Sequence, residues 1–303
     1  MEKVIVICGP TASGKTSLSI ELAKRINGEI VSCDSMQIYQ EMNIGTAKPT
    51  VEEMQGIKHY VLDFVSPEER YSVADYKRDA KKAIKEIINK GKTPIVVGGT
   101  GLYIDSLIYE IEYPNIKFDE DYRQQLEKRV KEEGLEKLYE EAEKIDPSAI
   151  QKISQNDEKR ILRILEIYHA TGKTKTQQEI ESRKKPAEYD YRVYGLKWDR
   201  EILYERINKR VDKMIEKGLI EEVKEILKKH KEFPTAMQGL GYKEVVEYLN
   251  GNDTKEEMIE KIKMETRRYS KRQMTWFRKN KQTIWLDGQA EVESNIDVIL
   301  KNL

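Results

Sequence analysis

The segment VICGPTASGKTSLSIELAKRI, at positions 6–26, constrains the fold of this chain more than any other stretch. The β-branched run at 4–8 predicts a strand, and the apolar spacing of Leu18, Leu22 and Ile26 predicts a helix. Between them, GPTASGKT at 9–16 satisfies the pattern G-x-x-x-x-G-K-S/T. Because the pattern lies between a predicted strand and a predicted helix, we interpret it as a phosphate-binding loop.

This loop contains the groups needed to bind a diphosphate or triphosphate. Gly9 and Gly14 allow tight backbone turns, and successive N–H groups point toward an anion at the helix N-terminus. Lys15 is placed to neutralise phosphate charge, and the Thr16 hydroxyl is the candidate ligand for Mg²⁺. The candidate diphosphate-binding residues are Gly9, Pro10, Thr11, Ala12, Ser13, Gly14, Lys15 and Thr16.

The alternation of apolar runs predicts an α/β protein with a parallel sheet covered by helices on both faces. Strand-like runs lie at 29–33 and 93–99, and a helical pattern lies between them at 73–89. A charged, strand-free segment then predicts an all-helical insertion at 116–189. The β-like run YRVYGLKW at 191–198 resumes the sheet. The expected P-loop core therefore covers 1–115 and 190–303, with C-terminal helices at 199–217 and 255–279.

Composition narrows the class of protein further. The chain has 303 residues and no apolar run approaching the length of a membrane span, and its first residues lack the features of a signal peptide. We therefore expect a cytoplasmic location and no contact with a membrane. The two cysteines, Cys8 and Cys33, lie in apolar β-type runs, so we expect core thiols rather than a disulfide or a zinc site.

A carboxylate is expected beside the phosphate loop. NTPases place one at the end of a neighbouring strand, yet the run PIVVGGT ends in two glycines and Thr100. Asp34 follows the strand at 29–33 instead, at the carboxyl edge where α/β enzymes bind their ligands. This pattern leaves two alternatives open: a small-molecule kinase, or a transferase in which diphosphate is the leaving group and the loop stabilises its developing charge.

Six segments together resemble one family, the tRNA dimethylallyltransferases. They are GPTASGKT, VSCDSMQIYQEMNIGTAKPT, ERYSVADYKRDA, VVGGTGLYIDSL, QNDEKRILRILEIYHATGK and RRYSKRQMTWFRK, and the likeness runs in order from Cys8 to about Trp285. The resemblance implies transfer of a dimethylallyl group from dimethylallyl diphosphate to N6 of the tRNA adenine at position 37, beside the anticodon. It also implies Mg²⁺ and no redox cofactor. The chain lacks the Cys/His zinc module of the eukaryotic relatives.

The resemblance also assigns residue roles. Asp34 matches the proposed general base, Thr100 and Arg123 match positions assigned to the reaction site, and Arg206 matches a position that would carry positive charge toward the diphosphate. The catalytic candidates are Asp34, Thr100 and Arg206. The candidates for tRNA contact are Asp34, Ser35, Met36, Gln37, Thr100, Arg123, Lys159, Arg160, Ile161, Leu162, Arg163, Gln238, Gly239, Leu240, Gly241, Tyr242 and Lys243.

Charge placement supports an RNA partner, although formal net charge is zero. The segment at 261–281 contains nine Lys and Arg residues and only one acidic residue, Glu265. Such spacing predicts a basic helix face suited to phosphates, the alternative being an ordinary solvated face. Two rival activities remain open: an isopentenyltransferase acting on AMP or ATP, and a small-molecule kinase. We expect a monomer whose partners are the tRNA anticodon stem-loop and dimethylallyl diphosphate.

Overall fold

The computed structural model describes residues 1–113, 119–182 and 186–303. The chain forms two compact units. The first contains Met1–Ile104 and Glu188–Leu303, and the second contains Asp105–Ala187. Within the described residues, none of the helices has both the length and the apolar character needed to cross a membrane.

Six parallel strands form one sheet in the described part of the first unit, in the order β3-β2-β4-β1-β5-β6. They are β1 (Lys3–Cys8), β2 (Gly28–Cys33), β3 (His59–Tyr60), β4 (Thr93–Gly98), β5 (Asp190–Lys197) and β6 (Ile284–Asp287). The parallel α/β sheet predicted from the sequence is confirmed. The edge strands β3 and β6 were not predicted, because runs of two and four residues carry too little periodicity.

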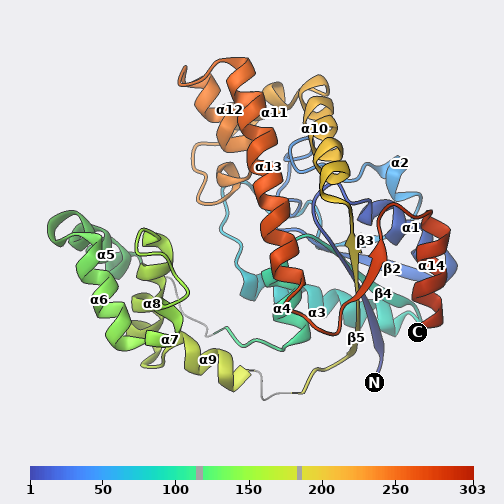
Figure 1. The fold of residues 1–303 in the computed structure, drawn as a ribbon, viewed down its shortest axis with the longest axis horizontal. Coiled ribbons are helices and arrows are strands. Elements are labelled where there is room, and N and C mark those ends of the chain that lie inside the picture. The colour runs from blue at the N-terminus through green and yellow to red at the C-terminus, as the bar shows by residue number, and fades with distance from the viewer. Residues whose placement is uncertain (114–118, 183–185) are drawn as a thin grey trace. The chain divides into compact units, whose positions relative to one another are not determined.

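Helices pack on both sides of this sheet (Figure 1). Helices α1 (Lys15–Arg25) and α14 (Val292–Lys301) contribute Leu18, Leu22 and Ile296 to a core with β1 and β5. On the other side lies α3 (Val73–Asn89), which begins at a capping box formed by Ser72 and packs on β2 and β4. Cys8 and Cys33 are both buried thiols in the core, as expected.

A second core lies at the C-terminal helices of the same unit. It contains α10 (Arg200–Glu216), α11 (Leu219–Lys229), α12 (Tyr242–Leu249) and α13 (Lys255–Phe277), together with the 3₁₀ turn Ala236–Gln238. Ile38, Tyr39 and Met42, from the chain that follows β2, are buried among these helices. The short helix α2 (Val51–Met54) comes after that segment. The carboxyl edge of the sheet and the helical core are therefore joined through residues 34–50.

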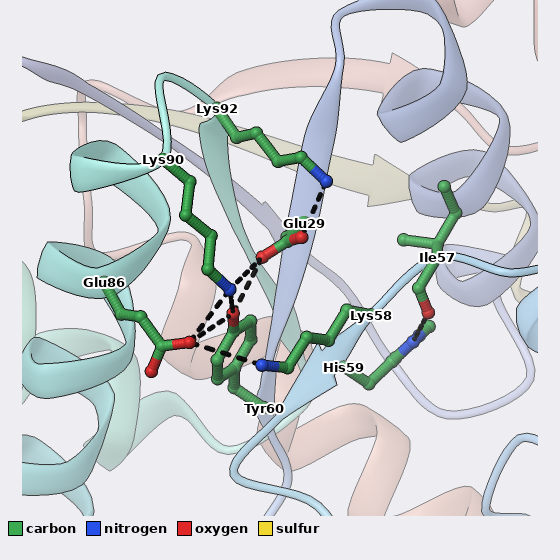
Figure 2. A network of polar contacts seen from close by, with 8 residues as sticks. All are labelled: Glu29, Ile57, Lys58, His59, Tyr60, Glu86, Lys90 and Lys92. Carbon is green, nitrogen blue, oxygen red and sulfur yellow. Dashed lines mark hydrogen bonds and ion pairs between the residues drawn. The ribbon is translucent and has the colours of Figure 1, made fainter.

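A polar network fills the opposite, amino end of β2 (Figure 2). The Glu29 carboxylate, 6% exposed, accepts hydrogen bonds of 2.7 Å from both Lys92 and Tyr60. Although burial acts in the opposite direction, these two bonds hold the pKa of Glu29 below its usual value. Tyr60 also donates to Glu86 at 2.9 Å, and Lys90 pairs with both carboxylates. The network ties the edge strand β3 to β2 and to α3.

In the second unit, helices are the regular secondary structure of the described residues, as the sequence predicted. Its helices are α5 (Glu120–Glu133), α6 (Leu135–Ile145), α7 (Pro147–Ile150), α8 (Glu158–Thr171) and α9 (Lys175–Ser182), and it includes the end of α4 (Gly101–Ile108). Side chains from α5, α6 and α8, including Leu126, Leu138 and Leu165, form its core.

Candidate active site

The loop between β1 and α1 has the backbone geometry of an anion cradle. Ala12 and Gly14 adopt left-handed conformations, with φ of 62° and 90°, and no side chain caps α1 at Gly14. The first N–H groups of α1 are thus directed out of the helix end, where its dipole favours an anion. The Lys15 ammonium turns back over the loop and donates to the Pro10 carbonyl oxygen at 2.7 Å.

The pKa of Lys15 is lower than that of an ordinary lysine. Burial of the ammonium lowers its pKa to about 8, and the nearby Arg210 guanidinium adds to the shift, whereas the Asp34 charge opposes it. Two enclosed cations and one carboxylate therefore share this site. A bound diphosphate would neutralise the two cations, which makes the site suited to a multiply charged anion.

Asp34 follows β2 at the carboxyl edge of the sheet, as predicted. Its Oδ1 accepts hydrogen bonds from the backbone N–H groups of Met36 at 2.9 Å and Gln37 at 3.3 Å. Among the described residues nothing donates to its Oδ2. The turn at 34–37 therefore fixes the carboxylate and leaves one oxygen available to a ligand.

Thr100 lies at the end of β4, next to this turn. Its Oγ1 accepts a hydrogen bond of 3.0 Å from the Ser35 N–H and donates to the Ser35 hydroxyl at 3.4 Å. Its own N–H donates to the Cys33 carbonyl oxygen at 3.2 Å. The Thr100 side chain thus supports the Asp34 turn directly.

One cavity of about 380 Å³ brings three predicted segments together. Thr11, Lys15 and Thr16 of the phosphate loop line it, as do the turn at 34–37 and the segment at 238–243. The Tyr242 side chain within the last segment is fully buried, and its hydroxyl donates to Glu222 at 2.6 Å. This tyrosine supports the cavity wall from inside the protein. Within 238–243, we therefore expect the RNA contacts to come from the residues on either side of Tyr242 and not from its side chain.

Arg206 and Arg210 lie one turn apart on α10 and have different environments. Arg206 Nε donates to the Ala12 carbonyl oxygen at 2.9 Å, and its guanidinium lies 4.2 Å from the centre of the Trp198 ring. Arg206 is exposed and does not line the cavity, whereas Arg210 does. Burial lowers the pKa of Arg210, and the Asp34 charge opposes this effect. The structure thus places Arg210, which the sequence did not identify, in the cavity wall with Lys15, while Arg206 contacts the backbone of the phosphate loop.

Gln273 on α13 is a second residue that the sequence did not identify. Its Oε1 accepts a hydrogen bond from the Thr11 N–H, and its Nε2 donates to the Gly99 carbonyl oxygen, both at 2.9 Å. A Cβ on Gly99 would lie 2.3 Å from this Nε2, so a larger residue there would displace the Gln273 amide. Gln273 therefore links the phosphate loop to the end of β4, one residue before Thr100.

Some basic side chains of the segment at 261–281 are bound to acidic or amide side chains from outside that segment. Lys263 pairs with Asp212 at 2.8 Å, Lys261 pairs with Asp253, and Arg267 donates to the Asn208 side chain. These partners come from other parts of the chain, so the local sequence did not reveal them. The basic residues of this segment that stay exposed are Lys261, Arg268, Lys271, Arg272, Arg278, Lys279 and Lys281, of which Arg272 also lines the cavity.

The remaining predicted residues lie in the helical unit. Arg123 on α5 pairs with Glu127 at 2.8 Å and Glu166 at 2.9 Å. On α8, Ile161 and Leu162 are fully buried in the core. Because they are buried, these two side chains do not offer the surface for RNA contact that we expected of them. Their basic neighbours Lys159, Arg160 and Arg163 are exposed on the same helix.

Comparison with known proteins identifies the family of this chain. A family model described as IPP transferase matches residues 37–280. The chain belongs to this family. The curated tRNA dimethylallyltransferase of Acetivibrio thermocellus is 52% identical over 304 residues, covering 100% of this chain and 96% of that protein. The one from Carboxydothermus hydrogenoformans is 50% identical over 290 residues, covering 96% and 93%.

Solved structures agree with this assignment. The tRNA isopentenylpyrophosphate transferase of Bacillus halodurans matches 100% of this chain and 95% of its own, with a TM-score of 0.75 and 42% identity. A eukaryotic dimethylallyltransferase described as acting on tRNA matches 99% of this chain and 78% of its own, with a TM-score of 0.83 and 31% identity. The family resemblance drawn from the six sequence segments is confirmed.

Proposed function

We propose that this protein is a tRNA dimethylallyltransferase, which transfers a dimethylallyl group from dimethylallyl diphosphate to N6 of the adenine at position 37 and releases diphosphate. One observation carries the proposal: the phosphate loop and Asp34 line the same cavity. A leaving diphosphate and an attacking amine can therefore lie on opposite sides of one carbon atom. Membership of the IPP transferase family supports this reading.

The donor diphosphate binds at the loop. Backbone N–H groups at the start of α1, the Lys15 ammonium and the Arg210 guanidinium surround it, and each interaction strengthens as the C–O bond breaks and negative charge moves onto the diphosphate. Arg206 holds the loop backbone through the Ala12 carbonyl oxygen rather than touching the donor.

The adenine approaches from the side of Asp34. An exocyclic amine is a weak nucleophile because its lone pair is shared with the ring, so Asp34 accepts the N6 proton while the C–N bond forms. Met36 and Gln37 hold Oδ1 by their N–H groups, which aims Oδ2 at the amine. The base must first leave the anticodon loop stack to enter the cavity.

Mg²⁺ fits this site as a partner of the diphosphate. Within the described residues no cluster of His, Cys, Asp or Glu side chains could hold a metal on its own. Thr16 lines the cavity next to Lys15, and Mg²⁺ commonly uses one or two protein oxygens plus phosphate oxygens and water. When bound there, the ion supplies positive charge to the leaving diphosphate.

The RNA grip is assigned to exposed basic residues in both units. Lys159, Arg160 and Arg163 form one cluster on α8, and Arg272 on α13 and Arg278 directly after that helix form another. Phosphate contacts of this kind give affinity without reading sequence. We further propose that the protein acts in the cytoplasm, as a monomer.

One assay tests the function. Dimethylallyl diphosphate labelled in its prenyl group is incubated with an anticodon stem-loop containing A37, or with AMP, and ATP labelled in its γ-phosphate is incubated with the same acceptors. We expect prenyl label on the stem-loop adenine alone. Label on AMP in place of RNA, or phosphoryl transfer from ATP, would overturn the proposal.

A further inference from the structure

The Glu222 carboxylate, near the N-terminus of α11, is fully engaged by other parts of the chain. Its Oε2 accepts from the N–H groups of Asn43 at 3.0 Å and Ile44 at 2.7 Å. Its Oε1 accepts from the Gly45 N–H at 3.1 Å and the Tyr242 hydroxyl at 2.6 Å. Four donors saturate the usual capacity of a carboxylate. Glu222 therefore fixes the backbone of 43–45 and the Tyr242 ring relative to α11.

The loop fixed in this way holds two side chains that line the cavity. The Thr46 carbonyl oxygen accepts from Gln37 Nε2 at 3.1 Å and from Arg210 Nη2 at 3.4 Å. The Ala47 carbonyl oxygen accepts from the same Gln37 nitrogen at 3.2 Å. Where these two carbonyl groups point therefore decides where the Gln37 amide and the Arg210 guanidinium lie.

The packing around Gly45 makes this arrangement sensitive to small shifts. A Cβ on Gly45 would lie 2.4 Å from the Tyr242 ring and 2.9 Å from Leu219. Tyr242 is fully buried, and Leu219 belongs to the same core. The loop and the ring are thus in direct contact, and Glu222 holds both members of that contact.

We propose that Glu222 is a positioning residue, which sets the loop at 43–47 and through it places the Arg210 guanidinium against the donor diphosphate and the Gln37 side-chain amide in the cavity wall. This rests on the function proposed above. Glu222 does not itself touch the reacting atoms, because the loop backbone lies between it and the side chains of Arg210 and Gln37. Its removal should weaken donor binding while leaving the acid–base chemistry of Asp34 unchanged.

The test compares Glu222→Gln with Glu221→Gln, which removes one charge from the same first turn of α11 at an exposed position. The glutamine keeps the size of the side chain but turns an NH₂ group toward loop donors, so it cannot accept all four bonds. We expect the KM for dimethylallyl diphosphate to rise about tenfold in Glu222→Gln, with most of kcat and its pH profile retained. Glu221→Gln should match the unchanged protein.

A double-mutant cycle shows whether the effect passes through Arg210. If it does, Glu222→Gln added to Arg210→Gln should raise the donor KM far less than it does alone, because the two changes remove the same interaction. Additive effects, or a loss of active protein at unchanged KM, would overturn the proposal. Tyr242→Phe, which removes one of the four donors and keeps the ring, should give a smaller rise and covers the case in which Glu222→Gln fails to fold.

The proposal and the function it rests on can fail separately. Absence of prenyl transfer to RNA by the unchanged protein would refute the function. Normal transfer by the unchanged protein, together with equal donor KM values for the Glu222 and Glu221 variants, would refute the positioning role alone.

Discussion

The side-chain oxygen of Gln273 accepts a hydrogen bond of 2.9 Å from the backbone N–H of Thr11, which joins the last long helix to the phosphate loop. The same amide donates to the Gly99 carbonyl oxygen at the end of β4. The segments that follow β1 and β4 are therefore held together by one buried side chain.

Replacing Gln273 by leucine should damage stability and donor binding together. The change leaves the Thr11 N–H and the Gly99 carbonyl without their partner, at a cost of about 1–3 kcal/mol for each buried group. We expect a lower free energy of unfolding in urea and a higher KM for dimethylallyl diphosphate. Gln282→Leu, at an exposed position on the same C-terminal part of the chain, serves as the control. Equal behaviour of the two variants would contradict the bridging role.

Substitution of Arg210 and substitution of Arg206 should have different effects on the KM for dimethylallyl diphosphate. Because Arg210 lines the cavity and Arg206 contacts the loop backbone, Arg210→Gln should raise the donor KM about tenfold to a hundredfold, the value of a charge-assisted hydrogen bond. Arg206→Gln should have a much smaller effect, since it removes one backbone contact and a stacking interaction. A larger loss for Arg206 than for Arg210 would contradict this division of roles and support the diphosphate contact expected of Arg206 from the sequence.

The sequence predicts those residues of the site that lie directly after a strand, and it does not predict those that helix packing brings there. The phosphate loop and Asp34 are local: each comes directly after a strand, and parallel strands bring their carboxyl ends together. Helix packing brings Gln273 and Arg210 to the site and Glu222 to the loop that supports it, and local sequence spacing does not reveal such packing. Arg206 and Arg210 are four residues apart on one helix, so only their burial distinguishes them.

Donor binding should depend on pH through Lys15. Its pKa is lowered to about 8 by burial, so the free protein loses this positive charge as the pH rises through that value. A bound diphosphate favours the charged form, so binding near pH 8 takes up protons and weakens at higher pH. Calorimetric titration with dimethylallyl diphosphate, whose phosphate groups are already ionised at this pH, in buffers of different ionisation enthalpy measures this uptake. Binding that releases protons, or exchanges none, would contradict the shifted Lys15.

The basic cluster on α8 should contribute to tRNA affinity through phosphates. Arg160, with 68% of its side chain exposed, pairs only loosely with Asp157 at 3.4 Å. Arg160→Gln should lower tRNA affinity and reduce the slope of log K against log salt by about 0.7–0.9, the contribution of one phosphate contact. Lys128→Gln removes an exposed cation from α5 of the same unit and should leave the slope unchanged. An unaltered slope for Arg160→Gln would remove this residue from the interface.

The most direct measurement is single-turnover prenyl transfer by Asp34→Asn, with labelled dimethylallyl diphosphate and an anticodon stem-loop. Asparagine keeps the Oδ1 that accepts from Met36 and Gln37, so the turn and RNA binding should persist. Only the oxygen that would receive the N6 proton is lost. We predict a transfer rate lower by about 10²–10⁴-fold with unchanged stem-loop affinity. A rate close to that of the unchanged protein, with the stem-loop still bound, would contradict the account.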